Sequence, residues 1–335
     1  MSFSNGQKGF INEDEAYLNE GNTISFGQDT ATMFYQESPY FTGDKIKILK
    51  PKNKRFGKNN AQFFISTMMR AFSSFSWGSS SFNVKIIANQ KITLPISKKG
   101  KIDFDFMESF IAELEAERIA GLKAHLLATG LNDFTLTEDE KKVLAEYGNI
   151  EWMEFRLGDL FKVVNTKKLT FKADDLPKQP TGKYTLPCLT SSFKNQGLNY
   201  FVPKDEATIL KNVISIPSNS DVYRAYFQSN EFTVLSDAYA IRWIFNDTEL
   251  SPNQYLFMVQ CINKVTDLAI YSYKNKLGGW NVVKNKNIQL PVRNNKPDYD
   301  TMEIFISAIQ KLFMKDVVLY ADKKISATKD IVKAN

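Results

Sequence analysis

The chain has 335 residues, of which 43% are hydrophobic and 24% charged, as in an ordinary globular protein long enough for two domains. It shows no apolar run of membrane-spanning length and no secretory leader pattern, and it holds only two cysteines, so we expect a cytoplasmic protein with no membrane partner and no disulfide framework. The net charge of +6 permits a nucleic-acid partner without requiring one.

The N-terminal part of the chain is predicted to be β-rich and to end in a long helix. Alternating stretches predict strands at residues 23–26 and 45–49, and the densest basic run follows at residues 50–58. An Ile-x-Leu-Pro segment predicts another strand at residues 92–95. The helix is expected over residues 104–127, N-capped by Asp103, with an apolar stripe of Phe106, Phe110, Leu114, Leu122 and Leu126.

Residues 129–149 are expected to connect this part to the next. Thr137, followed three residues later by Glu140, is typical of a capping box. The pattern predicts a short helix over residues 138–147.

The C-terminal part repeats the same plan. Strands are predicted at residues 232–235, 240–244 and 288–291, and a long helix over residues 299–325 begins at Asp298. Each long helix spans roughly 33 Å, the length of a spacer. We expect the two helices to pack antiparallel, the second through a stripe of Met302, Phe305, Ile309 and Leu312.

Five blocks of the first part recur in the same order in the second. NTIS at residues 22–25 returns as NVIS at 212–215, FYQ at 34–36 as YFQ at 226–228, and NQKITLP at 89–95 as NKNIQLP at 285–291. The other two blocks are residues 60–64 with 252–256 and residues 103–108 with 298–303. Ordered recurrence of this kind predicts an internal duplication.

The second copy has an opening segment, residues 151–190, that has no counterpart ahead of Ser2. In this segment a strand is predicted over residues 155–161. We therefore expect an N-terminally truncated chain whose first domain has an unpaired sheet edge or an incomplete core. Sequence-specific contacts are then expected mainly from the second domain.

Catalytic chemistry is not predicted for this chain. It has one histidine, His125, on the first long helix, and no glycine-rich phosphate loop or amino-methyltransferase motif. Asp298 and Asp322, which imitate a metal-dependent nuclease motif, stand at opposite ends of one predicted helix, roughly 36 Å apart. No metal, cofactor or catalytic residue is predicted here.

The segment WMEFRLGDLF at residues 152–161 resembles the opening of a target recognition domain in type I restriction-modification specificity subunits. The Ile-x-Leu-Pro segments before both long helices are similar to the end of that unit, and the resemblance covers nearly the whole chain.

The resemblance implies two domains that each read half of a split double-stranded DNA site, with helices that fix the gap between the two halves. It also implies docked methyltransferase subunits, with restriction-translocase subunits as a further expected partner, so that S-adenosylmethionine, Mg²⁺ and ATP are held by these partners. The alternatives left open are the specificity subunit of a type II enzyme that cuts on both sides of its site, an inactive or truncated half-specificity protein, and an interaction protein that does not bind nucleic acid.

These observations predict an α+β fold with two β-rich target recognition domains, each followed by a spacer helix. The boundaries are residues 1–102 for the first domain, 103–150 for its helix and connector, 151–296 for the second domain, and 297–335 for its helix.

Residues expected to contact DNA are basic side chains for phosphates and polar side chains for base edges. In the first domain these are Lys52, Lys54, Arg55 and Lys58. In the second domain they lie in three polar loops and comprise Ser192, Lys194, Asn195, Gln196, Asn219, Tyr223, Arg224, Lys274, Asn275 and Lys276. Trp77 and Trp280, beside such loops, are expected to pack rather than bind.

Overall fold

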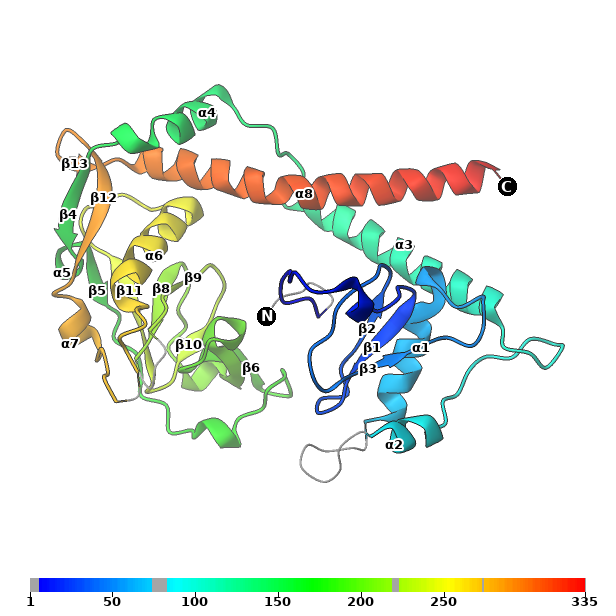
Figure 1. Ribbon diagram of the computed structural model, residues 1–335. Helices are drawn as coiled ribbons and strands as arrows, with labels where there is room; N and C mark the ends of the chain where they lie inside the picture. The colour runs from blue at the N-terminus through cyan, green and yellow to red at the C-terminus, as the bar shows by residue number, and fades with distance from the viewer. Residues whose placement is uncertain (1–5, 74–82, 219–222, 273, 335) are drawn as a thin grey trace. The chain divides into compact units, whose positions relative to one another are not determined.

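The structure, a computed structural model, describes residues 6–73, 83–218, 223–272 and 274–334 and confirms the α+β class (Figure 1). The chain divides into two units. Unit 1 comprises Met1–Thr129 and Leu319–Asn335, and unit 2 comprises Gly130–Val318. Helix α8 (Tyr299–Ala334) therefore contributes residues to both units. Among the described helices, none is long and apolar enough to cross a membrane.

Unit 1 is built on a three-stranded antiparallel sheet in the order β2-β1-β3. Its strands are β1 (Thr23–Gly27), β2 (Met33–Gln36) and β3 (Ile46–Leu49), and its helices before α8 are α1 (Lys58–Ala71), α2 (Val84–Asn89) and α3 (Phe104–Ala128). Strand β1 is buried along its whole length. Its Phe26 packs edge to face on Phe72, with ring centroids 5.1 Å apart, and Ile65 of α1 joins the same core.

Unit 2 contains three small sheets, ordered β10-β6-β7, β5-β11-β8-β9 and β13-β12-β4. The strands are β4 (Trp152–Arg156), β5 (Phe161–Val163), β6 (Tyr184–Leu189), β7 (Leu198–Pro203), β8 (Val213–Pro217), β9 (Tyr226–Gln228), β10 (Thr233–Val234), β11 (Ala238–Trp243), β12 (Asn287–Arg293) and β13 (Lys296–Pro297). The helices are α4 (Glu138–Ala145), α5 (Leu157–Leu160), α6 (Pro252–Thr266), α7 (Trp280–Val283) and the N-terminal part of α8.

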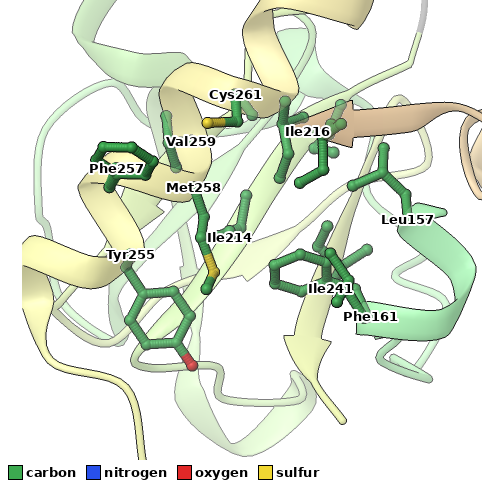
Figure 2. Close-up of a cluster of buried hydrophobic side chains, with 14 of the residues drawn as sticks. Leu157, Phe161, Ile214, Ile216, Ile241, Tyr255, Phe257, Met258, Val259 and Cys261 are labelled. Carbon is green, nitrogen blue, oxygen red and sulfur yellow. The ribbon is translucent and has the colours of Figure 1, made fainter. Parts of the chain in front are cut away.

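The largest core lies in unit 2, where α6 covers the sheet that contains β8 and β11 (Figure 2). Met258 of α6 packs over Ile214 and Ile241 of the sheet, and all three side chains are fully buried. Leu157 and Phe161 from the opening segment join the same cluster. The opening segment is thus an integral part of this core.

The internal duplication is a structural repeat. Strands β8, β9 and β11 reproduce the pairing of β1, β2 and β3, because Ile214 pairs with Phe227 as Ile24 pairs with Tyr35. In each copy a glutamine of the second strand donates to a serine of the first. The distances are 3.0 Å from Gln36 Nε2 to Ser25 Oγ and 3.1 Å from Gln228 Nε2 to Ser215 Oγ. This shared bond aligns the two copies residue by residue.

Most of the predicted elements are confirmed, including the two long helices and their caps. Asp103 accepts a hydrogen bond from the Phe106 N–H, Asp298 accepts one from the Thr301 N–H, and Thr137 and Glu140 form the predicted capping box of α4. The long helices extend somewhat past their predicted C-terminal ends, and α4 is slightly shorter than predicted.

Two strand predictions are wrong. Residues 92–95 form no strand, whereas their counterparts in β12 pair with β4. A strand needs a partner, and among the described residues of unit 1 none pairs with residues 92–95. The strand predicted at residues 155–161 is divided between β4, the helical turn α5 and β5.

The helix pair has a different interface from the predicted one. Within unit 1, α3 meets the C-terminal part of α8 through ion pairs of Lys123 with Asp322 at 2.6 Å and Lys324 with Glu115 at 3.4 Å. As the residue numbers rise along one helix, those of its ion-pair partners fall along the other, so the segments run antiparallel.

The predicted apolar stripe of α3 is only partly buried. On α3, Leu126 of the predicted stripe is buried and Leu122 is half-buried, whereas Phe106, Phe110 and Leu114 are exposed. Phe106 and Phe110 lie against the Phe63 ring of α1, with centroids 6.4 and 5.9 Å from it.

On α8, part of the predicted stripe packs into the core of unit 2. Met302 is fully buried in that core, and Phe305 packs edge to face on Phe257 at 6.0 Å. Ile309 is half-buried and Leu312 is exposed. The periodicity thus identified helices with an apolar face, and on α8 part of that face packs into the core of unit 2.

Candidate functional site

Three polar loops of unit 2 form the candidate site. They comprise residues 190–197, 218–225 and 271–279, of which 219–222 and 273 lie outside the described residues. Asn219 therefore lies outside the described part, as does Trp77 in unit 1. The three loops are far apart in sequence, so their association depends on the contacts described below.

The first loop is held in a tight left-handed turn. Asn195, Gln196 and Gly197 have φ values of +48°, +54° and +85°, a conformation that costs free energy for the two residues with a β-carbon. The turn is closed by hydrogen bonds from the Thr190 N–H to the Gly197 carbonyl at 2.9 Å and from Asn195 Nδ2 to the Leu198 carbonyl at 2.7 Å. Gln196 is exposed at its tip.

Two further residues of this loop have been predicted to contact DNA. Ser192 is half-buried, and its hydroxyl oxygen accepts a hydrogen bond from the Lys194 N–H at 3.1 Å. The Lys194 side chain is exposed. The loop thus presents an amide and an ammonium group on a constrained backbone.

Arg224 joins the first two loops to helix α6. Its guanidinium lies 2.6 Å from the Asp267 carboxylate, just past the end of α6, and 5.7 Å from the centre of the Phe193 ring in the first loop. The hydrogen bond to Asp267 raises the pKa of Arg224 further. Next to it, Asn263 of α6 bonds both the N–H and the carbonyl of Ala225, at 2.7 and 3.2 Å. The position of Arg224 is therefore well defined.

The structure corrects the prediction for Tyr223, which is 1% exposed and belongs to the core. A side chain buried in this way does not reach a base edge without opening the core. Its ring instead packs on Tyr271 at 5.8 Å, which brings the third loop to the second, and Lys286 donates to the Tyr271 hydroxyl at 2.9 Å.

The third loop presents Lys274, Asn275 and Lys276, all exposed. Asn275 also shapes the loop, because its Nδ2 donates to the Ile270 carbonyl at 2.8 Å. Trp280, at the start of α7, is half-buried and contacts Tyr239, as expected for a packing residue.

In unit 1 the predicted basic residues are of two kinds. Arg55 is paired with Asp105 at 2.7 Å and lies over the Phe104 ring at 5.2 Å, and Lys58 is paired with Glu37 at 2.8 Å. Lys52 and Lys54 are exposed, and neither has a partner among the residues that the structure describes. The basic run therefore offers fewer open cations than its composition indicates.

In each copy, a glutamate at the start of the long helix accepts hydrogen bonds from its own domain. This role was not predicted from the sequence. Glu108 of α3 accepts from Asn60 Nδ2 at 3.0 Å and lies 3.5 Å from the Arg55 guanidinium. In the second copy, Glu303 of α8 accepts from Asn253 Nδ2 at 2.7 Å and from the Ser251 hydroxyl. Both glutamates are the last residue of the repeated six-residue block at the start of the long helices. Their recurrence in the repeat could have indicated their shared role.

The cysteines and the aspartates of the nuclease-like pattern are either buried or held in hydrogen bonds and ion pairs. Burial raises the pKa of the Cys188 and Cys261 thiols to about 12, so neither is a reactive thiolate at neutral pH. Asp298 caps α8 and pairs with Arg293 at 3.0 Å, while Asp322 pairs with Lys123. Across the described ranges, no three His, Cys, Asp or Glu residues lie close enough together to hold a metal ion.

The chain has two similar α+β domains, and each continues into a long helix. Polar loops meet on one of these domains. This arrangement is typical of a protein that recognises another molecule rather than one that performs catalysis. Comparison with known proteins agrees with this. The family model of the type I restriction modification DNA specificity domain matches residues 1–124 and 149–315, and the chain belongs to this family. It is a specificity subunit of a restriction-modification system, and its role is DNA sequence recognition.

The chain is also similar to individual proteins. It is 23% identical over 310 residues to the type II restriction enzyme specificity subunit S.BcgI of Heyndrickxia coagulans, which covers 91% of this chain and 83% of the relative. A type I restriction-modification S subunit from M. genitalium has a TM-score of 0.49 and 14% identity, covering 94% of this chain and 82% of that chain. A chain from a structure on the assembly and conformational transition of the type I system has a TM-score of 0.39 and 10% identity, covering 95% and 80%.

Proposed function

We propose that the chain reads a two-part double-stranded DNA site and that the three-loop face of unit 2 reads one half of it. The observation that carries this proposal is that Arg224 and Tyr271 bring together the described residues of the loops at 190–197, 218–225 and 271–279. Base edges in the major groove are recognised by amide and guanidinium groups, and phosphates by cations. Both kinds of group are concentrated on this face.

Within the face, Gln196 and the two lysines Lys194 and Lys274 are our proposed direct contacts. An exposed glutamine on a rigid turn can offer both its donor and its acceptor to an adenine edge. Asn219, Asn275 and Lys276 are further proposed contacts on the same loops. Arg224 has its guanidinium engaged by Asp267, so we assign it to positioning the first two loops, with Ser192 and Asn195 shaping the turn.

For unit 1 we propose phosphate contacts by Lys52 and Lys54. They are exposed and without a partner in the described part of the chain. Arg55 and Lys58, also predicted from the sequence, are assigned a smaller share because each already has a carboxylate partner. Contacts of this kind add affinity without adding base preference.

We further propose that the chain itself is not catalytic and assembles with methyltransferase and restriction-translocase subunits, which bring S-adenosylmethionine, Mg²⁺ and ATP. The exposed stripe of Phe106, Phe110 and Leu114 on α3 is a proposed part of the surface for a methyltransferase subunit. The similarity to S.BcgI supports a second candidate, the specificity subunit of a type II enzyme. Neighbouring genes distinguish the two, since only a type I system needs a separate translocase.

The proposal is tested by binding the chain, assembled with its methyltransferase, to its target and to unrelated duplexes at several salt concentrations. We expect the double variant Gln196→Ala, Lys274→Ala to lose most of its preference for the target. The double variant Lys52→Ala, Lys54→Ala should bind all duplexes more weakly, with a slope against salt smaller by about two. Lys141→Ala, on the exposed face of α4, is the matched control. Unchanged preference in the first variant would contradict the proposed face.

A further inference from the structure

Unit 1 contains an apolar cavity of about 250 Å³ at the end of strand β3. Apolar side chains from the sheet, from the loop after β3 and from helices α1 and α3 line it, among them Ile24, Leu49, Pro51, Phe56, Phe64 and Phe104. Lys50, Lys52 and Asn53 of the same loop also border it. Strand β3 pairs with β1 along one edge. No described strand pairs with its other edge, so the cavity lies beside a free row of backbone hydrogen-bonding groups.

The corresponding place in unit 2 is occupied. Leu49 stands opposite Ile24 in unit 1, as Ile241 stands opposite Ile214 in unit 2, so β11 is the counterpart of β3. On its other edge β11 pairs with β5, the strand at the end of the opening segment. β5 pairs there with residues 241–243, which correspond to residues 49–51, so the edge that β5 covers in the second copy is the free edge at the end of β3 and just after it.

The other residues that line the cavity also have counterparts in unit 2. Gly57 and Ser251 are the N-caps of α1 and α6, and Asp103 and Asp298 precede α3 and α8. These alignments give a unit 2 counterpart for each of the six apolar lining residues named above, in the order Ile214, Ile241, Trp243, Leu250, Met258 and Tyr299.

All six counterparts belong to, or pack against, one buried cluster. That cluster also contains Leu157, Leu160 and Phe161 of the opening segment, each no more than 1% exposed. The cavity of unit 1 thus corresponds to the apolar site that Leu157, Leu160 and Phe161 fill in unit 2.

We infer that this cavity is a docking site for a polypeptide segment from outside residues 1–335, of the pattern Leu-x-x-Leu-Phe-x-Val, which adds as a strand to the free edge of β3. Strand addition provides backbone hydrogen bonds, and the apolar side chains filling the cavity provide specificity. A second copy of the chain is not the expected donor, because its own Leu157, Leu160 and Phe161 are buried in its unit 2 core.

The inference is tested with a fluorescently labelled peptide of residues 151–166, titrated with the full chain and followed by anisotropy. Saturable binding is expected. A control peptide carrying Leu157→Asn, Leu160→Asn and Phe161→Asn should not bind, because amide side chains would be buried without partners. In the full chain, Leu49→Lys should weaken binding of the first peptide about tenfold or more, since it places a charge in the cavity. Ile46→Lys, at the exposed start of the same strand, is the matched control and should bind like the unchanged chain.

Hydrogen exchange on the unchanged chain gives a second readout that does not depend on whether Leu49→Lys folds. Bound peptide should slow exchange of the β3 amides and leave those of β11 unaltered. The inference is overturned if no saturable binding occurs, if Leu49→Lys binds as tightly as Ile46→Lys, or if protection appears at β11 instead. Concentration-dependent dimers that exchange residues 157–163 would also overturn it, since the donor would then be a second copy.

Discussion

At the scale of single residues, Glu140 is the best-defined charged group of unit 2. It is 4% exposed and accepts hydrogen bonds from Ser307, from the Lys311 ammonium at 2.9 Å and from the Thr137 N–H. Burial by itself would raise the pKa of Glu140, but these hydrogen bonds and the Lys311 charge outweigh it and lower the pKa to about 2. Glu140 thus connects α4 to α8 as a carboxylate.

We predict that Glu140→Gln lowers the free energy of unfolding of unit 2 by about 2 kcal/mol at neutral pH, since Lys311 loses the nearer and more buried of its two carboxylate partners, the other being Asp133 at 3.9 Å. Because the folded pKa lies below the usual 4.5, the stabilisation is present above about pH 4.5 and is lost as the pH falls towards 2. Thermal unfolding of both proteins across this range measures it. Glu138→Gln, on the exposed side of α4, should melt like the unchanged chain, and a Glu140→Gln curve that matches it at pH 7 would refute the assignment.

The residues of the candidate site show what composition can reveal. The amides and lysines of the three loops were identifiable because base and phosphate recognition require those groups. Their assembly was not identifiable, because the pairing of Arg224 with Asp267 links positions that are distant in sequence and follow no local pattern. Tyr223 was misassigned for the same reason, since a tyrosine in a polar loop shows no periodicity that would reveal its burial.

At the scale of elements, the glutamates at the starts of α3 and α8 set how each long helix leaves its domain. We predict that Glu303→Ala, which leaves Asn253 and Ser251 without their acceptor, costs about 1–3 kcal/mol and speeds hydrogen exchange in the first turns of α8. Asp316→Ala, at an exposed position of the same helix, should change neither quantity. Equal exchange rates in the two variants would show that Glu303 does not anchor the helix.

Elements were predictable where the signal is local and less so where it depends on a partner. The helices follow from caps and apolar periodicity, and their starts at residues 104, 138 and 299 agree with the structure. Strand formation is not local, and this explains the difference between residues 92–95 and β12, which have nearly the same pattern. The second has β4 beside it, and the first has no described partner. Likewise, periodicity places Phe106 and Met302 on apolar faces but does not say what those faces contact.

At the scale of the whole molecule, the duplication gives two domains with the same plan and different loops. Unit 2 has a large buried core and a face where three polar loops meet, whereas unit 1 has an open cavity, and Arg55 and Lys58 of its basic run are already paired with carboxylates. We therefore expect the half-site read by unit 2 to be the stricter of the two. Two half-sites of equal strictness would count against this asymmetry.

The central claim is that the three-loop face of unit 2 determines which DNA sequence the assembled complex modifies. The most direct test is a genome-wide methylation map of cells that carry the cognate methyltransferase with either the unchanged chain or the Gln196→Ala, Lys274→Ala variant. We predict a two-part methylated site for the unchanged chain, and in the variant a relaxed base preference in one half only, with the other half and the gap unaltered. A methylated site that is identical in both strains, or that changes in both halves at once, would contradict the account.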